Sequence, residues 1–310
     1  MKVMVLAGGP DREREVSLQS GKQVAAALRE AGHEVIQRDM GPDDLAALDE
    51  FALWSAEAPE GGAVFPIFHG RWGEGGPAQM ILDERGVRYV GCREAAARLC
   101  FDKTKTKQVL KDAGLPTPDF ELVNAVEKPT LTPPVVVKPN DEGSSIDLEI
   151  CHTADQLDKA WAGLSPRHDA LLVERFVAGR ELTVGVIEDP DNRGCVRALP
   201  PIQIVPATDF YDYEAKYVRD DTQYRFDFAP HDLDQTLRDL ACDTFTALGC
   251  RHLARVDLFL DESDRPWIIE VNTLPGFTSH SLLPMAARKS GLSMPALVDR
   301  LVRLAKGDGG

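Results

Sequence analysis

Two alternating segments near the C-terminal end, residues 254–260 and 267–272, constrain the fold of this chain most strongly. In both, every second residue is apolar, which is typical of β-strands with one buried face. The residues between them, 261–266 (DESDRP), have the composition of a turn. The sequence therefore predicts a β-hairpin. Its second strand is expected to bury Trp267, Ile269 and Val271 on one face.

The opposite face of this hairpin collects acidic and amide side chains. If Leu260 and Trp267 close the hairpin, Asp257 lies opposite Glu270, and Asn272 shares the face of Glu270. Two carboxylates that face each other repel, so the pairing suggests a cation between them. Oxygen ligands of this kind suit Mg²⁺ or Mn²⁺. The alternative is the solvated outer face of an ordinary hairpin, where water permits the repulsion at small cost.

The first ninety residues alternate between strand and helix patterns, which predicts a parallel α/β unit. The expected strands are 3–6, 34–36, 63–68 and 87–90, and the expected helices are 17–31 and 80–84. A further helix is expected after this unit, at 103–113. A smaller α+β unit is expected next, with strands 135–138, 146–150 and 170–173 and helix 154–164. Strand 183–187, helix 233–249, the hairpin and helix 295–305 complete the pattern.

Charge and composition exclude several classes of protein. The net charge is -15 and no basic stripe is visible, which argues against nucleic-acid binding. No apolar run is long enough to span a membrane, and the apolar start is too short for a signal peptide. None of the six cysteines has C-x-x-C spacing, so we expect reduced thiols in a cytoplasmic protein.

Four further segments suggest chemistry only weakly. Lys138 precedes a turn with Gly143, Ser144 and Ser145, which suits phosphate oxygens but also an ordinary hairpin turn. Residues 73–78 resemble a dinucleotide fingerprint without the acidic residue that it requires about twenty positions later. The tyrosine-rich loop 210–217 suggests a lid. Residues 278–281 suit a helix N-cap, and equally a carboxylate-binding helix start.

The combined motifs resemble the D-alanine–D-alanine ligase family of the ATP-grasp superfamily. The resemblance runs nearly from end to end, and several separate motifs in the right order are a specific signal. They are 13–17 (EREVS), 69–74, 101–103 (FDK), 137–139 with 143–145, 173–174 with Glu181, 211–217, 255–257 (RVD) and 270–281.

This resemblance implies an N-terminal α/β domain (1–92), followed by the small lobe (93–176) and the C-terminal lobe (177–310) of a two-lobed ATP-grasp fold. It implies a cytoplasmic, homodimeric ligase of peptidoglycan precursor synthesis. The enzyme would join two D-alanines through an acyl-phosphate, with ATP and two Mg²⁺ or Mn²⁺ ions per site.

The resemblance also implies a role for each matching residue. Lys103, Lys138, Ser144, Ser145 and Lys216 would contact ATP phosphates or close over them, and Glu174, Phe176, Val177 and Glu181 would bind adenine and ribose. Asp257, Glu270 and Asn272 would hold the metal ions. Glu13 would bind the ammonium of the first D-alanine, in a network with Ser144 and Tyr217. Substrate contacts would also come from His69, Lys216, Ser281 and Leu282, and Arg255 and the Gly276 N–H would stabilise the oxyanion.

Three positions depart from the family pattern, namely Gly75, Met80 and Asp147. They leave open a related ATP-grasp ligase that joins another amino or hydroxy acid. A nucleotide-binding protein without catalysis is a third hypothesis, although the residues expected for chemistry are all present.

Overall fold

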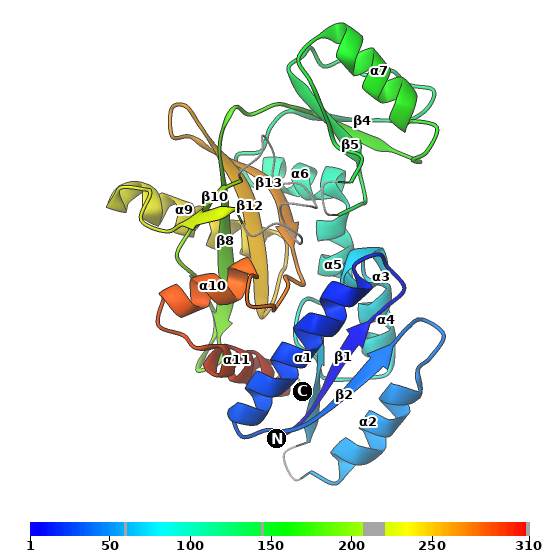
Figure 1. Ribbon diagram of the computed structural model, residues 1–310, viewed down its shortest axis with the longest axis vertical. Helices are drawn as coiled ribbons and strands as arrows, with labels where there is room; N and C mark the ends of the chain where they lie inside the picture. Colours follow the sequence, from blue (N-terminus) through cyan, green and yellow to red (C-terminus); the bar gives the residue numbers. More distant parts are fainter. Residues whose placement is uncertain (59–60, 144–145, 207–220, 308–310) are drawn as a thin grey trace.

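The computed structural model describes residues 1–58, 61–143, 146–206 and 221–307. Three sheets follow one another along the long axis of the molecule, with the N-terminal unit at one end and the small four-stranded unit at the other (Figure 1). Over the described ranges, none of the helices has both the length and the apolar composition required to cross a bilayer.

The N-terminal unit is built on a parallel sheet, as predicted, and its strand order is β2-β1-β3. Val3, Val5 and Ala7 of β1 pack on one side, and Met4 and Leu6 pack on the other, because helices cover both faces. The predicted strand 87–90 is wrong, since only an isolated parallel bridge between Val64 and Tyr89 forms there. The elements are β1 (Lys2–Gly8), α1 (Arg14–Glu30), β2 (Glu34–Met40), α2 (Ala46–Ala56), β3 (Gly62–Pro66), α3 (Gly70–Glu74) and α4 (Pro77–Glu84).

The small unit is an antiparallel sheet of order β4-β7-β5-β6, with one helix packed on it. Thr153 and Gln156 form a capping box, which satisfies the first free N–H groups of that helix. The elements are β4 (Phe120–Val123), β5 (Val135–Pro139), β6 (Glu149–Cys151), α7 (Ala154–Leu164) and β7 (Leu171–Arg175).

The third sheet is antiparallel, in the order β11-β10-β8-β12-β13, and β9 also pairs with β8. Helices α5 (Glu94–Phe101) and α6 (Lys103–Asp112) pack against it, so they share its core. Its elements are β8 (Gly179–Asp189), β9 (Asn192–Ala198), β10 (Ile202–Val205), β11 (Gln223–Arg225), α9 (His231–Ala247), β12 (Leu253–Asp261), β13 (Pro266–Asn272), α10 (Leu282–Lys289) and α11 (Met294–Lys306).

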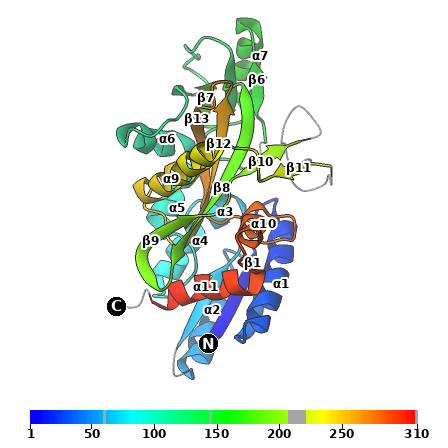
Figure 2. The ribbon, with the colours of Figure 1, turned by 90° about the vertical axis from the view of Figure 1, so that its left-hand side faces the viewer.

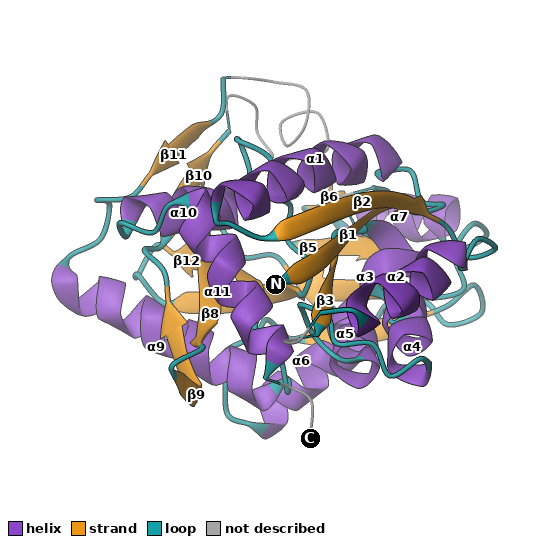
Figure 3. Cartoon of the chain, turned by 90° about the horizontal axis from the view of Figure 1, so that it is seen from below, coloured by secondary structure: helices purple, strands orange, loops and turns teal. Residues whose placement is uncertain are grey.

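The last two helices return to the N-terminal unit. Helix α11 lies beside α1, and apolar residues of α10 and α11 share one core with Val3 and Val5 of β1 (Figure 2, Figure 3). The two ends of the chain are therefore packed into the same body.

The β12–β13 hairpin has the predicted pairing at its open end but not at its turn. Asp257 pairs with Glu270, as expected, whereas Leu260 pairs with Pro266 instead of Trp267. A bulge compensates for the one-residue difference, because Leu258 pairs with Ile268 and leaves Ile269 without a partner across the hairpin. The expected burial of Trp267 and Ile269 is consequently wrong.

The bulge reverses the pleat of β13 on its turn side. Ile268 and Val271 face the core, and Ile268 is fully buried. The backbone N–H of Ile268 donates a hydrogen bond to the carbonyl of Pro116, at 2.8 Å. The backbone of Ile268 thus ties β13 to the segment that leads into the small unit, while Glu270, on the open side of the bulge, keeps its predicted pairing with Asp257.

Candidate active site

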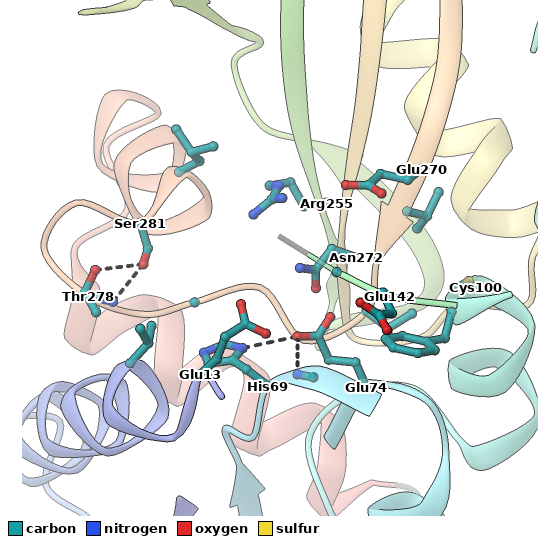
Figure 4. A pocket seen from close by; sticks show the side chains of 18 of the residues that line it. Glu13, His69, Glu74, Cys100, Glu142, Arg255, Glu270, Asn272, Thr278 and Ser281 are labelled. Atoms are coloured by element: carbon teal, nitrogen blue, oxygen red, sulfur yellow. Dashed lines mark hydrogen bonds and ion pairs between the residues drawn. The ribbon is translucent and has the colours of Figure 1, made fainter. Parts of the chain in front are cut away.

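A single pocket collects residues from all parts of the chain at the junction of the N-terminal unit, helices α5 and α6, and the β12–β13 hairpin (Figure 4). Glu13 is the N-cap of α1, and Ser281 is the N-cap of α10. Both helices therefore begin at the pocket, where their free N–H groups and positive dipole ends favour anions. Arg255, Glu270 and Asn272 enter from the hairpin.

Arg255 and Asp257 project from the same face of β12, two residues apart. The guanidinium forms a bidentate pair with the carboxylate, with Nε–Oδ1 at 2.8 Å and Nη2–Oδ2 at 2.7 Å. Thr183 of β8 donates its hydroxyl to Oδ1 of Asp257 at 2.5 Å. This geometry fixes the plane of the guanidinium, which lines the pocket.

The predicted metal ligands lie on adjacent strands, and two of them reach the pocket. Glu270 and Asn272 line it, while both oxygens of Asp257 are bonded to Arg255. Within the described ranges, no group of three or more His, Cys, Asp or Glu side chains is arranged to hold a metal ion. Two carboxylates and one amide nevertheless supply the oxygen ligands that Mg²⁺ and Mn²⁺ prefer, so the residues fit such an ion if Asp257 is shared with Arg255.

Two buried lysines, Lys103 and Lys138, each lie beside a carboxylate. Lys103, the first residue of α6, donates to the carbonyl of Glu142, and its Nζ lies 3.9 Å from Oε2 of Glu270. Burial lowers the pKa of Lys103, and the Glu270 carboxylate opposes that shift. Lys138 is the last residue but one of β5, and its Nζ lies 2.5 Å from Oε1 of Glu174. Both lysines expected for phosphate binding are thus held by carboxylates or carbonyls, and Lys103 lines the pocket.

The loop before α10 has a compact hydrogen-bonded form. Oγ of Ser281 accepts from the N–H of Thr278 at 2.9 Å and lies 2.9 Å from the Thr278 hydroxyl. Ser281 occupies the predicted N-cap position, but its side chain makes no capping bond to its own helix. Gly276 lies so close to Ser281 that a Cβ at position 276 would be 2.8 Å from Oγ of Ser281. Leu282 lines the same wall.

A His–Glu pair forms the floor of the pocket beneath Glu13. Nδ1 of His69 lies 3.3 Å from Oε1 of Glu74, which also accepts from the N–H of Gly70. Burial raises the pKa of Glu74, and His69 opposes that shift. The sequence predicted His69 but not Glu74 as a site residue. The signal in the sequence that could have indicated Glu74 was its position five residues after His69, at the end of a short helical segment.

The other described residues that were predicted to contact the nucleotide lie at the end of β7 and the start of β8. Phe176 directly follows β7, and its ring meets that of His152 edge-on at 5.7 Å. Val177 follows it, and Glu181 pairs with Phe259 at the start of β8. The predicted contacts from Ser144, Ser145, Lys216 and Tyr217, and the predicted lid 210–217, lie outside the described residues.

Two of the three departures from the family pattern, Gly75 and Asp147, have a local structural explanation. A Cβ at Gly75 would lie 2.5 Å from the carbonyl oxygen of Arg71, so a larger residue requires the helix to shift. Asp147 has φ 54°, and its carboxylate lies 2.7 Å from Nε2 of His168, which stabilises a conformation that favours glycine. Met80 is 40% exposed and is not part of the pocket.

Comparisons with known proteins agree with this geometry. A family model described as the D-ala D-ala ligase C-terminus matches residues 108–303. A D-alanine–D-alanine ligase of Marinobacter nauticus is 42% identical, covering 99% of this chain and 92% of the relative. Another, from Laribacter hongkongensis, is 41% identical over 98% of this chain and 96% of the relative.

Solved structures extend the similarity to the arrangement in space. The D-alanine–D-alanine ligase of Bacillus anthracis in complex with ATP has a TM-score of 0.81 at 27% identity, covering 98% of this chain and 97% of that one. The VanG D-Ala:D-Ser ligase of Enterococcus faecalis has a TM-score of 0.81 at 25% identity, covering 98% and 99%.

Proposed function

This chain belongs to the D-alanine–D-alanine ligase family, and we propose that it joins two D-alanine molecules while it converts ATP to ADP and phosphate, in peptidoglycan precursor synthesis. The observation that supports this most is the single pocket described above. It combines the Glu13 carboxylate, a fixed guanidinium, Glu270 and Asn272 of β13, and two helix starts, which suits two zwitterions and a transferred phosphoryl group.

Each substrate group has a partner of opposite charge. Glu13 binds the ammonium of the first D-alanine, and His69 lies below it. The Ser281 hydroxyl and the free backbone N–H of Leu282, at the start of α10, bind the carboxylate of the second. Lys103 and Lys138 contact the ATP phosphates, together with Ser144, Ser145 and Lys216.

On the nucleotide side, the backbone at Phe176 and Val177 contacts adenine, with Glu174 beside it, and Glu181 binds the ribose. Tyr217 joins Glu13 and Ser144 in closing the site.

The reaction then proceeds in two displacements. A carboxylate oxygen of the first D-alanine attacks the γ-phosphorus, and the bond to the ADP oxygen breaks. The amine of the second D-alanine attacks the acyl carbon, loses a proton, and phosphate leaves. Arg255, oriented by Asp257, and the N–H of Gly276 stabilise the tetrahedral oxyanion, and one such donor is worth roughly 3 kcal/mol.

Asp257, Glu270 and Asn272 would hold two Mg²⁺ or Mn²⁺ ions. The oxygen-only donor set supports this assignment, as does the position of Glu270 and Asn272 on the pocket wall beside Lys103. When bound, such ions neutralise charge on the phosphates. The bidentate Arg255–Asp257 pair implies that the guanidinium competes with such ions for both carboxylate oxygens of Asp257.

A second candidate is a ligase of the same fold that uses a different acceptor. Gly75, Met80 and Asp147, which depart from the family pattern, motivate it, and one structural neighbour is the VanG D-Ala:D-Ser ligase of Enterococcus faecalis. The pocket residues expected for the dipeptide product are otherwise present, so D-alanine is the first acceptor to test.

The deciding experiment is an ADP-release assay with ATP, Mg²⁺ and D-alanine, with product mass analysis. D-alanyl-D-alanine formed with one ADP per peptide supports the proposal. Turnover with D-serine or D-lactate but not with D-alanine would establish the second candidate. ATP binding without turnover on any acceptor would indicate a protein without catalysis.

We also propose that the protein is a cytoplasmic homodimer, which rests on the family alone. Light scattering coupled to size exclusion measures the mass in solution, and a monomer at all concentrations would refute the dimer.

A further inference from the structure

Lys107 is a buried cation that the proposed reaction does not use. It lies one turn after Lys103 on α6 and is fully buried. Its Nζ lies 2.7 Å from Oε2 of Glu174 and donates to the hydroxyl of Thr117 at 2.7 Å. An ammonium group at such a depth is costly unless it is paired, so its position demands a reason.

Glu174 connects Lys107 to a lysine of the nucleotide site. Its carboxylate is only 2% exposed, and its other oxygen, Oε1, lies 2.5 Å from Nζ of Lys138. Burial alone would raise the pKa of Glu174, but Lys107 and Lys138 lower it to about 2. The carboxylate is therefore ionised, and each of its oxygens meets one ammonium group.

Thr117 extends the same network to the metal-side hairpin. Its hydroxyl donates to the carbonyl of Ile268 at 2.9 Å, at the bulge of β13. Two and four residues further along this strand stand Glu270 and Asn272. Lys107 thus joins β5 and β7 of the small sheet to the strand that presents the acidic side chains.

We propose that Lys107 is a positioning residue for the phosphates of ATP. It fixes the Glu174 carboxylate, which holds the Lys138 ammonium, and through Thr117 it sets this group relative to β13. The inference rests on the proposed use of ATP but not on the identity of the amino acids.

Loss of the Lys107 charge has a defined consequence. Glu174 then faces a single cation, so its full charge acts on Lys138 and draws that ammonium away from the phosphates. The Glu174–Lys138 pair remains neutral, which leaves no orphaned buried charge in Lys107→Met. Because a charge-assisted contact to phosphate is weakened, the affinity for ATP should fall about tenfold. AMP, which lacks the β- and γ-phosphates, should lose less than about twofold.

The experiment compares the dissociation constants of Mg²⁺–ATP and AMP by calorimetry, without D-alanine. Lys111→Met is the matched control, because Lys111 lies one turn further on α6 and stacks on the same Phe120 ring while it remains partly exposed. The expected result is a selective loss of ATP affinity in Lys107→Met and no change beyond about twofold for either nucleotide in the control. Equal losses for ATP and AMP, or wild-type ATP affinity, would overturn the proposal.

Thr117→Val decides the question if Lys107→Met does not fold. It removes the hydroxyl that joins the Lys107 ammonium to Ile268 but leaves every charge in place. We expect about a threefold loss for ATP and none for AMP. An unchanged ATP-to-AMP affinity ratio would refute the positioning role. Failure of the ligase proposal itself would appear separately, as absent D-alanine turnover in the wild-type protein.

Discussion

Gly276 offers a sharp test of the acceptor site, because the structure leaves no room for a methyl group there. In Gly276→Ala, the new Cβ would lie 2.8 Å from Oγ and 3.7 Å from Cβ of Ser281. Ordinary contacts begin near 3.5 Å, so Ser281 must move by roughly 0.7 Å. That movement weakens the two 2.9 Å contacts to Thr278. At about 1 kcal/mol each, the loss is about 2 kcal/mol, or about thirtyfold in binding.

The assay is the D-alanine dependence of ADP release, fitted with one constant for each amino-acid site. We expect one constant to rise about thirtyfold, while the other and the ATP constant stay within about twofold. Gly163→Ala is the control, since a Cβ at Gly163 meets nothing within 4 Å and the residue lies in helix α7. An unchanged pair of D-alanine constants, or an equal loss for ATP, would show that the loop before α10 does not bind the acceptor.

Other perturbations test the remaining parts of the site. Arg255→Met should lower kcat by about 10²- to 10³-fold in steady-state assays, and a fall below about tenfold would remove it from the oxyanion site. Asp257→Ala and Glu270→Ala should each abolish turnover while circular dichroism stays native, and wild-type turnover in either would refute the metal assignment. Glu74→Gln tests the pH dependence of stability. Burial raises the pKa of Glu74 in the folded protein above 4.5, so the folded state retains a proton that the unfolded state has lost. The stability of the wild-type protein therefore falls as the pH rises above 4.5. Urea unfolding between pH 5 and pH 8 should show this fall reduced in the variant, and parallel profiles would contradict the burial argument.

The sequence predicted the hairpin ligands because strand alternation and pairing depend on neighbouring residues. Asp257 and Glu270 are opposite each other as expected, although the assumed closure at Leu260 and Trp267 was wrong. Three successive apolar residues, Trp267 to Ile269, cannot show which one a bulge leaves out. The contacts to Pro116 and Thr117, far away in sequence, decide it.

The Lys107–Glu174 ion pair could not be predicted from the sequence, for a different reason. The segment KTKTKQ at the start of α6 has the composition of an exposed helix face, and Glu174 follows 67 positions after Lys107. Only the spacing of Lys103, Lys107 and Leu110 places these lysines on the apolar face of the helix. Long-range ion pairs of this kind leave no periodic signal, so the structure is needed to find them.

The packing of α11 against the first sheet bears on how the chain is made. Val3 and Val5 of β1 belong to a core that Leu297, Val298 and Leu301 complete. During synthesis from the N-terminus, the part of this core that α11 covers stays exposed until nearly the whole chain has left the ribosome. A chain truncated before α11 would therefore expose apolar surface of α1 and β3, which α11 contacts, and would not merely lose its last helix.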